Sequence, residues 1–286
     1  MILKLDGKVC IVTGAGRGIG RGIAAEQARS GGRVALLGRG QDVETVAAEI
    51  NDEGGEARAY RVDILDAEAL RSVFAAIERD LGPVDLLTNN AASFYAIGPI
   101  WEVDPDVWWR DIELNVRGTF NCCRLVLPLM LERGAGRIIN LTGGGTGTSF
   151  PHGSGYGTSK AGVLRFTESV SDTLKESGVK MFAMDPGLVR TAMTEFQMTD
   201  PAGKKYLGDI DQLFARGIDV PSSMAGRLTV EIGSGRFDRL AGRMLFAARG
   251  DHDLNDAEID AIVAHDLRSL RINGTPDEHP YTGPRN

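Results

Sequence analysis

Short apolar runs alternate with longer amphipathic stretches through the first two-thirds of the 286-residue chain. Most of the apolar runs are continuous and end in Gly, Asp, Asn or Thr, as expected for strands that are buried on both faces of a sheet. The pattern predicts strands over residues 9–14, 33–38, 57–63, 84–90, 137–142 and 179–187.

Helical periodicity fills the stretches between these runs, and the predicted helices cover residues 18–30, 42–53, 66–80, roughly 105–132, and 156–177. Repeated strand–helix–strand units with short connections imply a parallel sheet whose crossovers are right-handed. A further helix over 220–235 and a last strand over 240–248 follow nearer the C-terminus. We therefore expect an α/β fold, a doubly wound parallel sheet of about seven strands with helices on both faces.

The regular alternation stops after the sixth predicted strand. Residues 188–219 mix apolar and polar positions without a clear period, and a long irregular insert in a compact domain is more often a lid or binding loop than a linker. The tail holds one more predicted helix, over 255–272, with Asn255 or Asp256 as its N-cap. We expect the chain to divide into a single domain over 1–250, its lid insert over 188–219, and a helical and extended tail over 251–286.

Composition and charge narrow the possible partners. The chain has 32 basic and 39 acidic residues, a net charge of −7, and this argues against nucleic acid and anionic membranes, because both select basic surfaces. Cys10, Cys122 and Cys123 form no CxxC pair, so neither a disulfide framework nor a zinc site is expected. The N-terminus lacks a leader pattern, and no apolar segment reaches the roughly 18 residues of a membrane span. We expect a cytoplasmic protein without a metal.

A glycine-rich turn, "TGAGRGIG" over 13–20, joins the first predicted strand to the first helix. Gly14, Gly18 and Gly20 allow a tight turn and a close approach to a phosphate, and the helix N-terminus beside Ile19 offers free N–H groups. Because glycine is common in this chain, the pattern alone is weak evidence, and a purely structural turn is the alternative. Its position between strand and helix favours a dinucleotide site.

The end of the second predicted strand bears on which dinucleotide binds. An acidic residue there would bind the ribose 2′-hydroxyl of NAD, but the position holds Gly38, followed by Arg39. Arg17 lies within the glycine turn, and two guanidinium groups suit a 2′-phosphate. NADP(H) is therefore favoured over NAD(H), with solvated surface charges as the alternative for either arginine.

Tyr156 and Lys160 are four residues apart and so share one face of a predicted helix. An ordinary tyrosine has a pKa of about 10, and a nearby ammonium group lowers it. Tyr156 could then act as a general acid in reduction of a carbonyl, or as a general base in oxidation of an alcohol. By itself the Y-x-x-x-K pattern occurs by chance in many helices.

Taken in order, the motifs resemble the short-chain dehydrogenase/reductase family, in its single-domain NAD(P)-binding branch. The resemblance covers residues 5–250 and implies a Rossmann-like fold and an oxidoreductase. The pieces that carry it are "TGAGRGIG" at 13–20, Asp63 after the third strand, "NNAA" at 89–92, Asn115 in "LNVRG", "YGTSK" at 156–160 and "DPGLVRT" at 185–191.

The resemblance also implies roles for individual residues. Asn115 would hold a water in a proton relay that ends at Lys160, and Lys160 would bind the nicotinamide ribose and lower the pKa of Tyr156. Cofactor contacts are implied for Asp63 and Ile64 at the adenine, for Asn90 and Ala91 at its ribose, and for Pro186, Gly187, Val189 and Thr191 at the nicotinamide. Family members are homo-oligomers, so a dimer or tetramer is expected, with Trp101, Trp108 and Trp109 either at the interface or in the core.

One departure from the family pattern affects catalysis directly. Family members carry a serine thirteen residues before the tyrosine, and here that position is Gly143. Thr142 is the nearest hydroxyl, although neighbours on a strand point to opposite faces. Three interpretations stay open: a substitute hydroxyl from Thr142, Thr146, Thr148 or Ser149; Tyr156 acting with another donor such as water; or weak or absent catalysis.

Two functions follow as hypotheses. The first is an NAD(P)(H)-dependent oxidoreductase that interconverts a secondary alcohol and a ketone in a largely apolar pocket, with residues 188–219 closing over it. The second is a dinucleotide-binding sensor or scaffold with little catalysis, because the usual serine is Gly143. The sequence does not indicate the identity of the substrate or the direction of the reaction.

Overall fold

The computed structural model describes residues 4–271 and is built around one parallel sheet with the strand order β3-β2-β1-β4-β5-β6-β7. The expected α/β doubly wound, Rossmann-like fold with seven strands is confirmed. The strands are β1 Val9–Thr13, β2 Arg33–Gly38, β3 Glu56–Arg61, β4 Val84–Asn89, β5 Gly136–Leu141, β6 Val179–Asp185 and β7 Met244–Phe246. The strand order reverses between β1 and β4, and ligands of such sheets bind beyond the carboxyl ends of the strands at that point.

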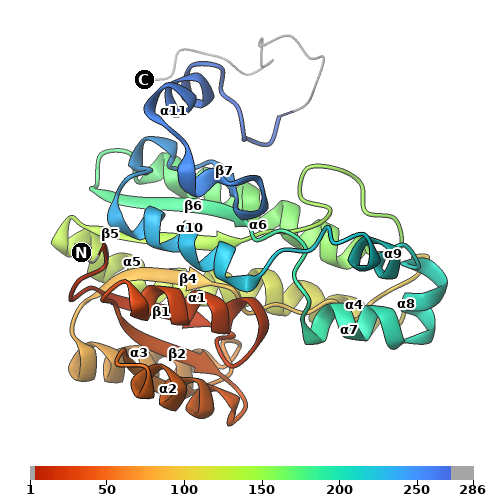
Figure 1. Cartoon of the computed structure of the whole chain (residues 1–286), viewed down its shortest axis with the longest axis horizontal. Helices are drawn as coiled ribbons and strands as arrows, with labels where there is room; N and C mark the ends of the chain where they lie inside the picture. The colour runs from red at the N-terminus through yellow and green to blue at the C-terminus, as the bar shows by residue number, and fades with distance from the viewer. Residues whose placement is uncertain (1–3, 272–286) are drawn as a thin grey trace.

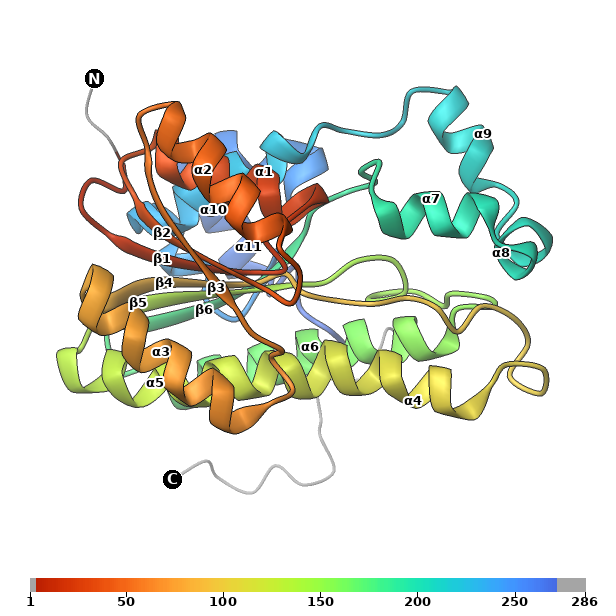
Figure 2. The same ribbon diagram turned by 90° about the horizontal axis from the view of Figure 1, so that it is seen from below.

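Helices cover both faces of the sheet in two layers (Figures 1 and 2). One layer contains α1 Gly18–Arg29, α2 Asp42–Asp52 and α10 Ser222–Ser234. The other contains α3 Ala67–Leu81, α4 Pro105–Ile112, α5 Thr119–Arg133 and α6 Ser154–Thr173.

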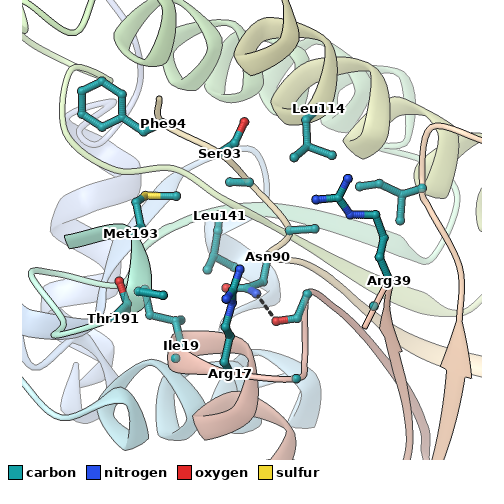
Figure 3. Close-up of a pocket in the computed structure, with 18 of the residues that line it drawn as sticks. Arg17, Ile19, Arg39, Asn90, Ser93, Phe94, Leu114, Leu141, Thr191 and Met193 are labelled. Carbon is teal, nitrogen blue, oxygen red and sulfur yellow. Dashed lines mark hydrogen bonds between the residues drawn. The ribbon is translucent and has the colours of Figure 1, made fainter. Parts of the chain in front are cut away.

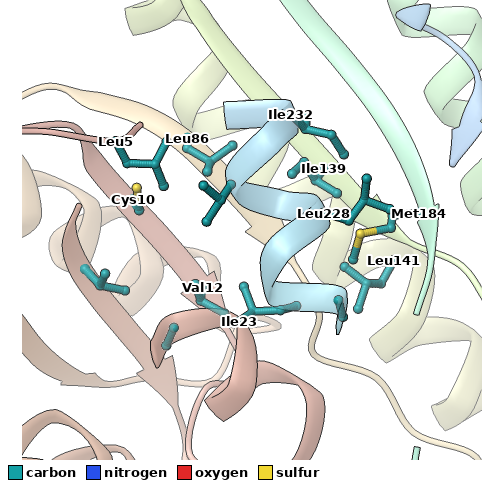
Figure 4. Packing of buried hydrophobic residues seen from close by; sticks show 14 of the residues in the cluster. Leu5, Cys10, Val12, Ile23, Leu86, Ile139, Leu141, Met184, Leu228 and Ile232 are labelled. Atoms are coloured by element: carbon teal, nitrogen blue, oxygen red, sulfur yellow. The ribbon is translucent and has the colours of Figure 1, made fainter. Parts of the chain in front are cut away.

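The continuous apolar runs are explained by two cores, one on each face of the sheet. In β1, Cys10 and Val12 point into one core while Val9 and Ile11 point into the other, because successive strand side chains alternate between faces. Figure 4 shows Leu228 of α10 among the side chains of the first core. These strands therefore lack a solvent face and are almost continuously apolar, whereas the edge strand β3 exposes Glu56, Arg58 and Arg61.

The long helix expected over 105–132 is present in three joined parts. Asp104 caps α4 by accepting from the backbone N–H groups of Asp106 and Val107, and α5 ends at the left-handed Gly134. Between them lies a π-helical segment, η1 Glu113–Gly118, which contains Asn115. Such π segments are rare and often occur at functional sites.

The insert over 188–219, expected to be irregular, instead forms three short helices at one end of the molecule (Figure 1). They are α7 Ala192–Thr199, α8 Pro201–Tyr206 and α9 Ile210–Ala215. Thr191 and Asp200 cap the first two by accepting backbone N–H groups. Helices of two turns or fewer are too short for a hydrophobic period to be recognised, which is why the pattern missed them.

The C-terminal elements are shorter than predicted. The strand expected over 240–248 reduces to β7, and the tail helix, α11 Asp256–Ala264, starts after its N-cap Asn255 as expected but ends eight residues early. Asp266 and Arg268 have φ values of 45° and 65°, a left-handed conformation that stops a helix. The polar end of the predicted tail lies outside the described residues.

Candidate active site

A cleft of about 750 Å³ opens beyond the carboxyl ends of the strands, where the strand order reverses (Figure 3). Fourteen of the eighteen residues predicted for the site line it: Gly14, Arg17, Gly18, Ile19, Arg39, Asp63, Ile64, Asn90, Ala91, Thr142, Tyr156, Lys160, Pro186 and Thr191. The lining does not include the other four, Gly20, Asn115, Gly187 and Val189. The predicted residues therefore gather from strands that are far apart in the sequence.

The glycine turn is packed so closely that larger residues do not fit. A Cβ atom added to Gly20 would lie 2.2 Å from the carbonyl oxygen of Gly14 and 2.6 Å from Nδ2 of Asn90. Gly14 and Gly18 have φ values of 64° and 55°, where glycine is favoured. The N-cap of α1 is Arg17, whose side chain makes no capping bond, so the first N–H groups of the helix face the cleft without a side-chain acceptor.

Asn90 ties this turn to the neighbouring strand. Its Nδ2 donates to the carbonyl oxygens of Thr13 at 2.9 Å and Gly14 at 3.1 Å, and its own N–H donates to Oγ1 of Thr13 at 3.0 Å. Figure 3 shows Asn90 in the cleft with one of these bonds as a dashed line. Ala91 donates its N–H to the same hydroxyl oxygen at 3.0 Å. The ends of β1 and β4 are thus held together where a dinucleotide would lie.

Charged side chains gather at the end of the cleft nearest β2. Arg17 and Arg39 are exposed there, and a guanidinium nitrogen of Arg39 lies 3.6 Å from a carboxylate oxygen of Asp63. Asp42, which the sequence analysis did not single out, also lines this end and covers Gly16. Two guanidinium groups and two carboxylates therefore surround the position expected for the adenosine ribose.

Tyr156 and Lys160 share one face of α6, as their spacing predicts. Nζ of Lys160 lies 5.6 Å from the centroid of the Tyr156 ring and donates to the carbonyl oxygen of Leu141 at 2.9 Å. The Tyr156 ring stacks on Phe94, with centroids 4.7 Å apart and planes 21° apart, and meets Phe150 edge-on. The tyrosine ring is thus held between aromatic side chains while it lines the cleft.

Electrostatics around this pair differ from the expectation that Lys160 lowers the pKa of Tyr156. Burial raises the pKa of Tyr156, and the negative charges of Asp185 and Asp111 raise it further. Burial also lowers the pKa of Lys160 to about 8, against the opposing effect of Asp185. The difference has a physical reason: the two groups are buried, and two carboxylates act on the tyrosine, Asp185 from the "DPGLVRT" motif and Asp111, which no motif indicated.

Asn115 lies within the π segment and is fully engaged with protein groups. Its Oδ1 accepts from the N–H of Ser93 at 2.8 Å, and its Nδ2 donates to the carbonyl oxygen of Ser93 at 3.0 Å and to Oγ of Ser159 at 2.9 Å. The hydroxyl of Thr119 donates to the Asn115 carbonyl oxygen at 2.8 Å. The predicted water relay from Asn115 to Lys160 stays a prediction.

Gly143, at the position where members of the resembled family carry a serine, lies next to the hydroxyl of Tyr156. A Cβ atom added there would lie 2.6 Å from the tyrosine oxygen. The hydroxyl of Thr142 instead donates to Sδ of Met244 at 3.3 Å, and that of Thr146 donates to the carbonyl oxygen of Gly143 at 2.6 Å. Both nearby hydroxyls therefore donate to groups other than Tyr156, while the side chains of Thr148 and Ser149 are exposed.

Two buried residues near the site carried no signal in the sequence. Ser93 lines the cleft, and its hydroxyl donates to Oδ1 of Asp111 at 2.5 Å. The two lie eighteen positions apart, so no short spacing could have paired them. Within residues 4–271, moreover, there is neither a helix apolar and long enough to cross a bilayer nor a group of three His, Cys, Asp or Glu side chains arranged for a metal ion.

Comparison with known proteins shows which protein family this chain is similar to. A family model described as short chain dehydrogenase matches residues 8–202. A short chain dehydrogenase of Pseudocercospora fijiensis is 37% identical over 193 residues, which are 66% of this chain and 62% of that protein. Oxidoreductase UcpA of Salmonella typhimurium is 33% identical over 67% of this chain and 73% of its own length. The chain thus spans less than two thirds of the fungal relative.

Two further proteins are similar to this chain, one in sequence and one in structure. A 3beta-hydroxysteroid dehydrogenase of Mediterraneibacter gnavus is 31% identical over 69% of this chain and 71% of its own length. A crystal structure of actinorhodin polyketide ketoreductase with NADPH superposes with a TM-score of 0.78 at 29% identity, covering 89% of this chain and all of that one.

Proposed function

Because the chain belongs to the short-chain dehydrogenase/reductase family of oxidoreductases, we propose that it interconverts a secondary alcohol and a ketone with NADP(H). One observation carries the proposal most directly: Tyr156 and Lys160 line the same cleft as the glycine turn, at the point where the strand order reverses. That arrangement places a proton donor and a dinucleotide site side by side.

The preference for NADP(H) rests on charge at the adenosine end of the cleft. Arg17 and Arg39 are both exposed at this end of the cleft, where a 2′-phosphate would lie. Gly38 occupies the position at which NAD-binding proteins carry an acidic residue. Arg39 would exchange its 3.6 Å contact with Asp63 for a charge-assisted bond to the phosphate. Solved relatives crystallised with NADPH or NADP are consistent with this preference.

In the proposed reaction the bound cofactor supplies or accepts the hydride. Tyr156 gives a proton to the ketone oxygen in reduction and takes one from the alcohol in oxidation. Lys160 would hold the nicotinamide ribose and carry a positive charge beside the tyrosine, and Asn115 would hold a water in the proton relay that ends at Lys160. Burial and two carboxylates raise the pKa of Tyr156, so the phenolate that would serve as the base in oxidation is disfavoured relative to the protonated hydroxyl that serves in reduction.

The substrate end of the cleft supports an uncharged, apolar substrate. Its walls include Phe94, Tyr95, Met193 and Phe196, and Tyr95 packs edge-on against Phe196 with ring centroids 5.0 Å apart. We infer that residues 188–219 act as a lid over this end, as part of a single domain over 1–250 with the remaining tail as an addition. Burial of apolar substrate surface under such a lid also excludes water from the hydride transfer.

We also infer that the chain self-associates as a dimer or tetramer through the α4–α5 helix. Trp109 and Phe120 on this helix are 63% and 46% exposed, and Trp101 just before it is 81% exposed. Large apolar side chains that gather on one helix favour a protein contact. Trp108 instead packs inward, where its indole N–H donates to Oγ of Ser154 at 3.0 Å.

The second candidate function, a dinucleotide-binding sensor or scaffold, is favoured by one observation. Gly143 brings no hydroxyl to the site, and the hydroxyls of Thr142 and Thr146 are bonded elsewhere. Loss of one such donor costs about 10²–10³ in rate, so it slows an enzyme without abolishing it. The enzyme is therefore the preferred proposal.

A panel of uncharged ketones and secondary alcohols, assayed with NADPH, NADH and their oxidised forms by nicotinamide absorbance, tests the proposal. We expect turnover of apolar ketones with NADPH and weaker turnover with NADH. Tight NADPH binding without turnover across the panel would support the sensor instead, and faster turnover with NADH would overturn the preference for NADP(H).

A further inference from the structure

Asp111 is a carboxylate buried completely within the protein, on the last turn of α4 and four residues before Asn115. Oδ1 accepts the hydroxyl of Ser93 at 2.5 Å, and Oδ2 accepts the backbone N–H groups of Tyr95 at 2.8 Å and Ala96 at 2.9 Å. Among residues 4–271 it takes part in no ion pair, so hydrogen bonds alone compensate its burial. Because burying a carboxylate costs solvation free energy, we expect Asp111 to have a role in the site.

The three donors all belong to one short segment, residues 93–96, which follows β4. Asn115 holds the same segment through both backbone groups of Ser93. Asp111 and Asn115 therefore act from one face of one helix, since residues four apart lie above each other. Between the bonded residues lies Phe94, a buried ring that stacks on Tyr156.

We propose that Asp111 is a positioning residue of the active site: it clamps the 93–96 segment and thereby holds Phe94 flat against the ring of Tyr156. This rests on the proposed role of Tyr156 in proton transfer. The need for such a clamp follows from Gly143, which contributes no side chain to steady the tyrosine hydroxyl. A misplacement of about 1 Å in a catalytic group can cost about 10² in rate.

The carboxylate also contributes a charge. Three charged side chains influence Tyr156 or lie beside it: Asp111 from α4, Asp185 from the end of β6, and Lys160 from α6. The two carboxylates raise the pKa of Tyr156 because they disfavour the phenolate. Removing the charge of Asp111 without moving the segment should therefore lower the pKa of Tyr156.

Two substitutions separate the clamp from the charge. In Asp111→Asn the amide oxygen can still accept from Tyr95 and Ala96, and the amide nitrogen can donate to the hydroxyl oxygen of Ser93, so the segment stays in place. In Asp111→Leu all three bonds are lost, while the branching and the number of non-hydrogen atoms of the side chain are kept. Asp106→Asn, on an exposed position of the same helix, is the matched control for the change in charge.

For Asp111→Leu we expect kcat to fall about 10- to 100-fold while the Kd for NADPH stays unchanged. For Asp111→Asn we expect kcat within about threefold of wild type at its optimum, and the rising limb of the pH profile for alcohol oxidation at lower pH, since the phenolate forms more easily. Asp106→Asn should leave both unchanged. The proposal is overturned if Asp111→Leu has the kcat of wild type, or if the pH profile of Asp111→Asn is the same as that of Asp106→Asn.

A measurement without turnover keeps this test independent of the proposed function. In protein labelled with ¹³C-tyrosine, the stacked ring of Phe94 shifts the resonances of Tyr156, which are assigned by their loss in Tyr156→Phe. We expect that shift to persist in Asp111→Asn and to disappear in Asp111→Leu. Should Asp111→Leu fail to fold, Ser93→Ala removes one of the three bonds and should reduce the shift. An unchanged shift in Asp111→Leu, or in Ser93→Ala where that variant takes its place, refutes the clamp. Missing turnover in wild type refutes only the enzyme.

Discussion

The cofactor end of the cleft and the catalytic end are held together by different kinds of contact. At the cofactor end, the side-chain amide of Asn90 donates to two backbone carbonyl oxygens of the glycine turn, and Gly20 leaves no room for a side chain. At the catalytic end, Tyr156 is held by side chains, by stacking on Phe94 and by a segment clamped from α4. The cofactor end therefore depends on the close packing of a backbone turn, and the catalytic end depends on the packing of side chains around Tyr156.

This difference explains which end is open to variation. A turn that must approach a phosphate closely requires glycine at defined positions, so it has a recognisable pattern. A site built from side-chain packing can lose one member, as at Gly143, and be steadied by others such as Asp111. The two ends should therefore respond to substitution in opposite ways: cofactor affinity should change at one and turnover at the other.

The largest expected effect is at the catalytic end. Tyr156→Phe keeps the ring that stacks on Phe94 but removes the proton donor, so kcat should fall by about 10²–10⁴ while the Kd for NADPH stays unchanged. Fluorescence of bound NADPH measures the affinity, and absorbance measures the turnover. Wild-type turnover in this variant would contradict the mechanism.

Next in size is a change at the cofactor end. Gly20→Ala places a Cβ atom 2.2 Å from a backbone oxygen that cannot move freely, an overpacking of about 1–3 kcal/mol, so the Kd for NADPH should rise about 10- to 100-fold. Turnover at saturating cofactor should change much less. Gly162→Ala is the control, because a Cβ atom there meets nothing within 4 Å. Equal affinities for the two variants would show that the turn is not packed as described.

A smaller effect is expected where the two ends meet, at Gly143. In Gly143→Ala the new Cβ atom lies 2.6 Å from the Tyr156 oxygen and pushes it aside, so kcat should fall about tenfold. Gly143→Ser adds the same atom and also a hydrogen-bond donor, so its kcat should exceed that of the alanine variant. If serine and alanine give the same kcat, the reaction does not use a donor at this position.

The smallest effect concerns the choice of cofactor. Arg39→Ala removes an exposed guanidinium group from the adenosine end, and because solvent screens an exposed charge the loss is about 0.2–1 kcal/mol, so KM for NADPH should rise up to about fivefold. KM for NADH should stay the same, because NADH has no 2′-phosphate. A parallel rise for both cofactors would assign Arg39 to general packing of the site.

Much of the fold could be read from the pattern of apolar residues. The strands β1, β2, β4, β5 and β6 follow from mostly continuous apolar runs, because burial on both faces removes the need for alternation. The glycine turn, Asn90, Tyr156 and Lys160 were likewise visible as motifs, since each depends on backbone geometry or on helical spacing. The three short helices in 188–219 and the brevity of β7 were not, because too few residues form each element to show a period.

What the sequence by itself determined is therefore the sheet, its layers and the residues whose spacing along one element places them together. Only the tertiary structure decided that Ser93 and Asp111 bond across eighteen positions, that the hydroxyl of Thr142 donates to Met244, and that a Cβ atom added at Gly143 would lie 2.6 Å from the Tyr156 oxygen. The physical reason is that a period encodes which face of an element is buried. Which side chains then meet inside depends on how separate elements pack, and no local pattern records that.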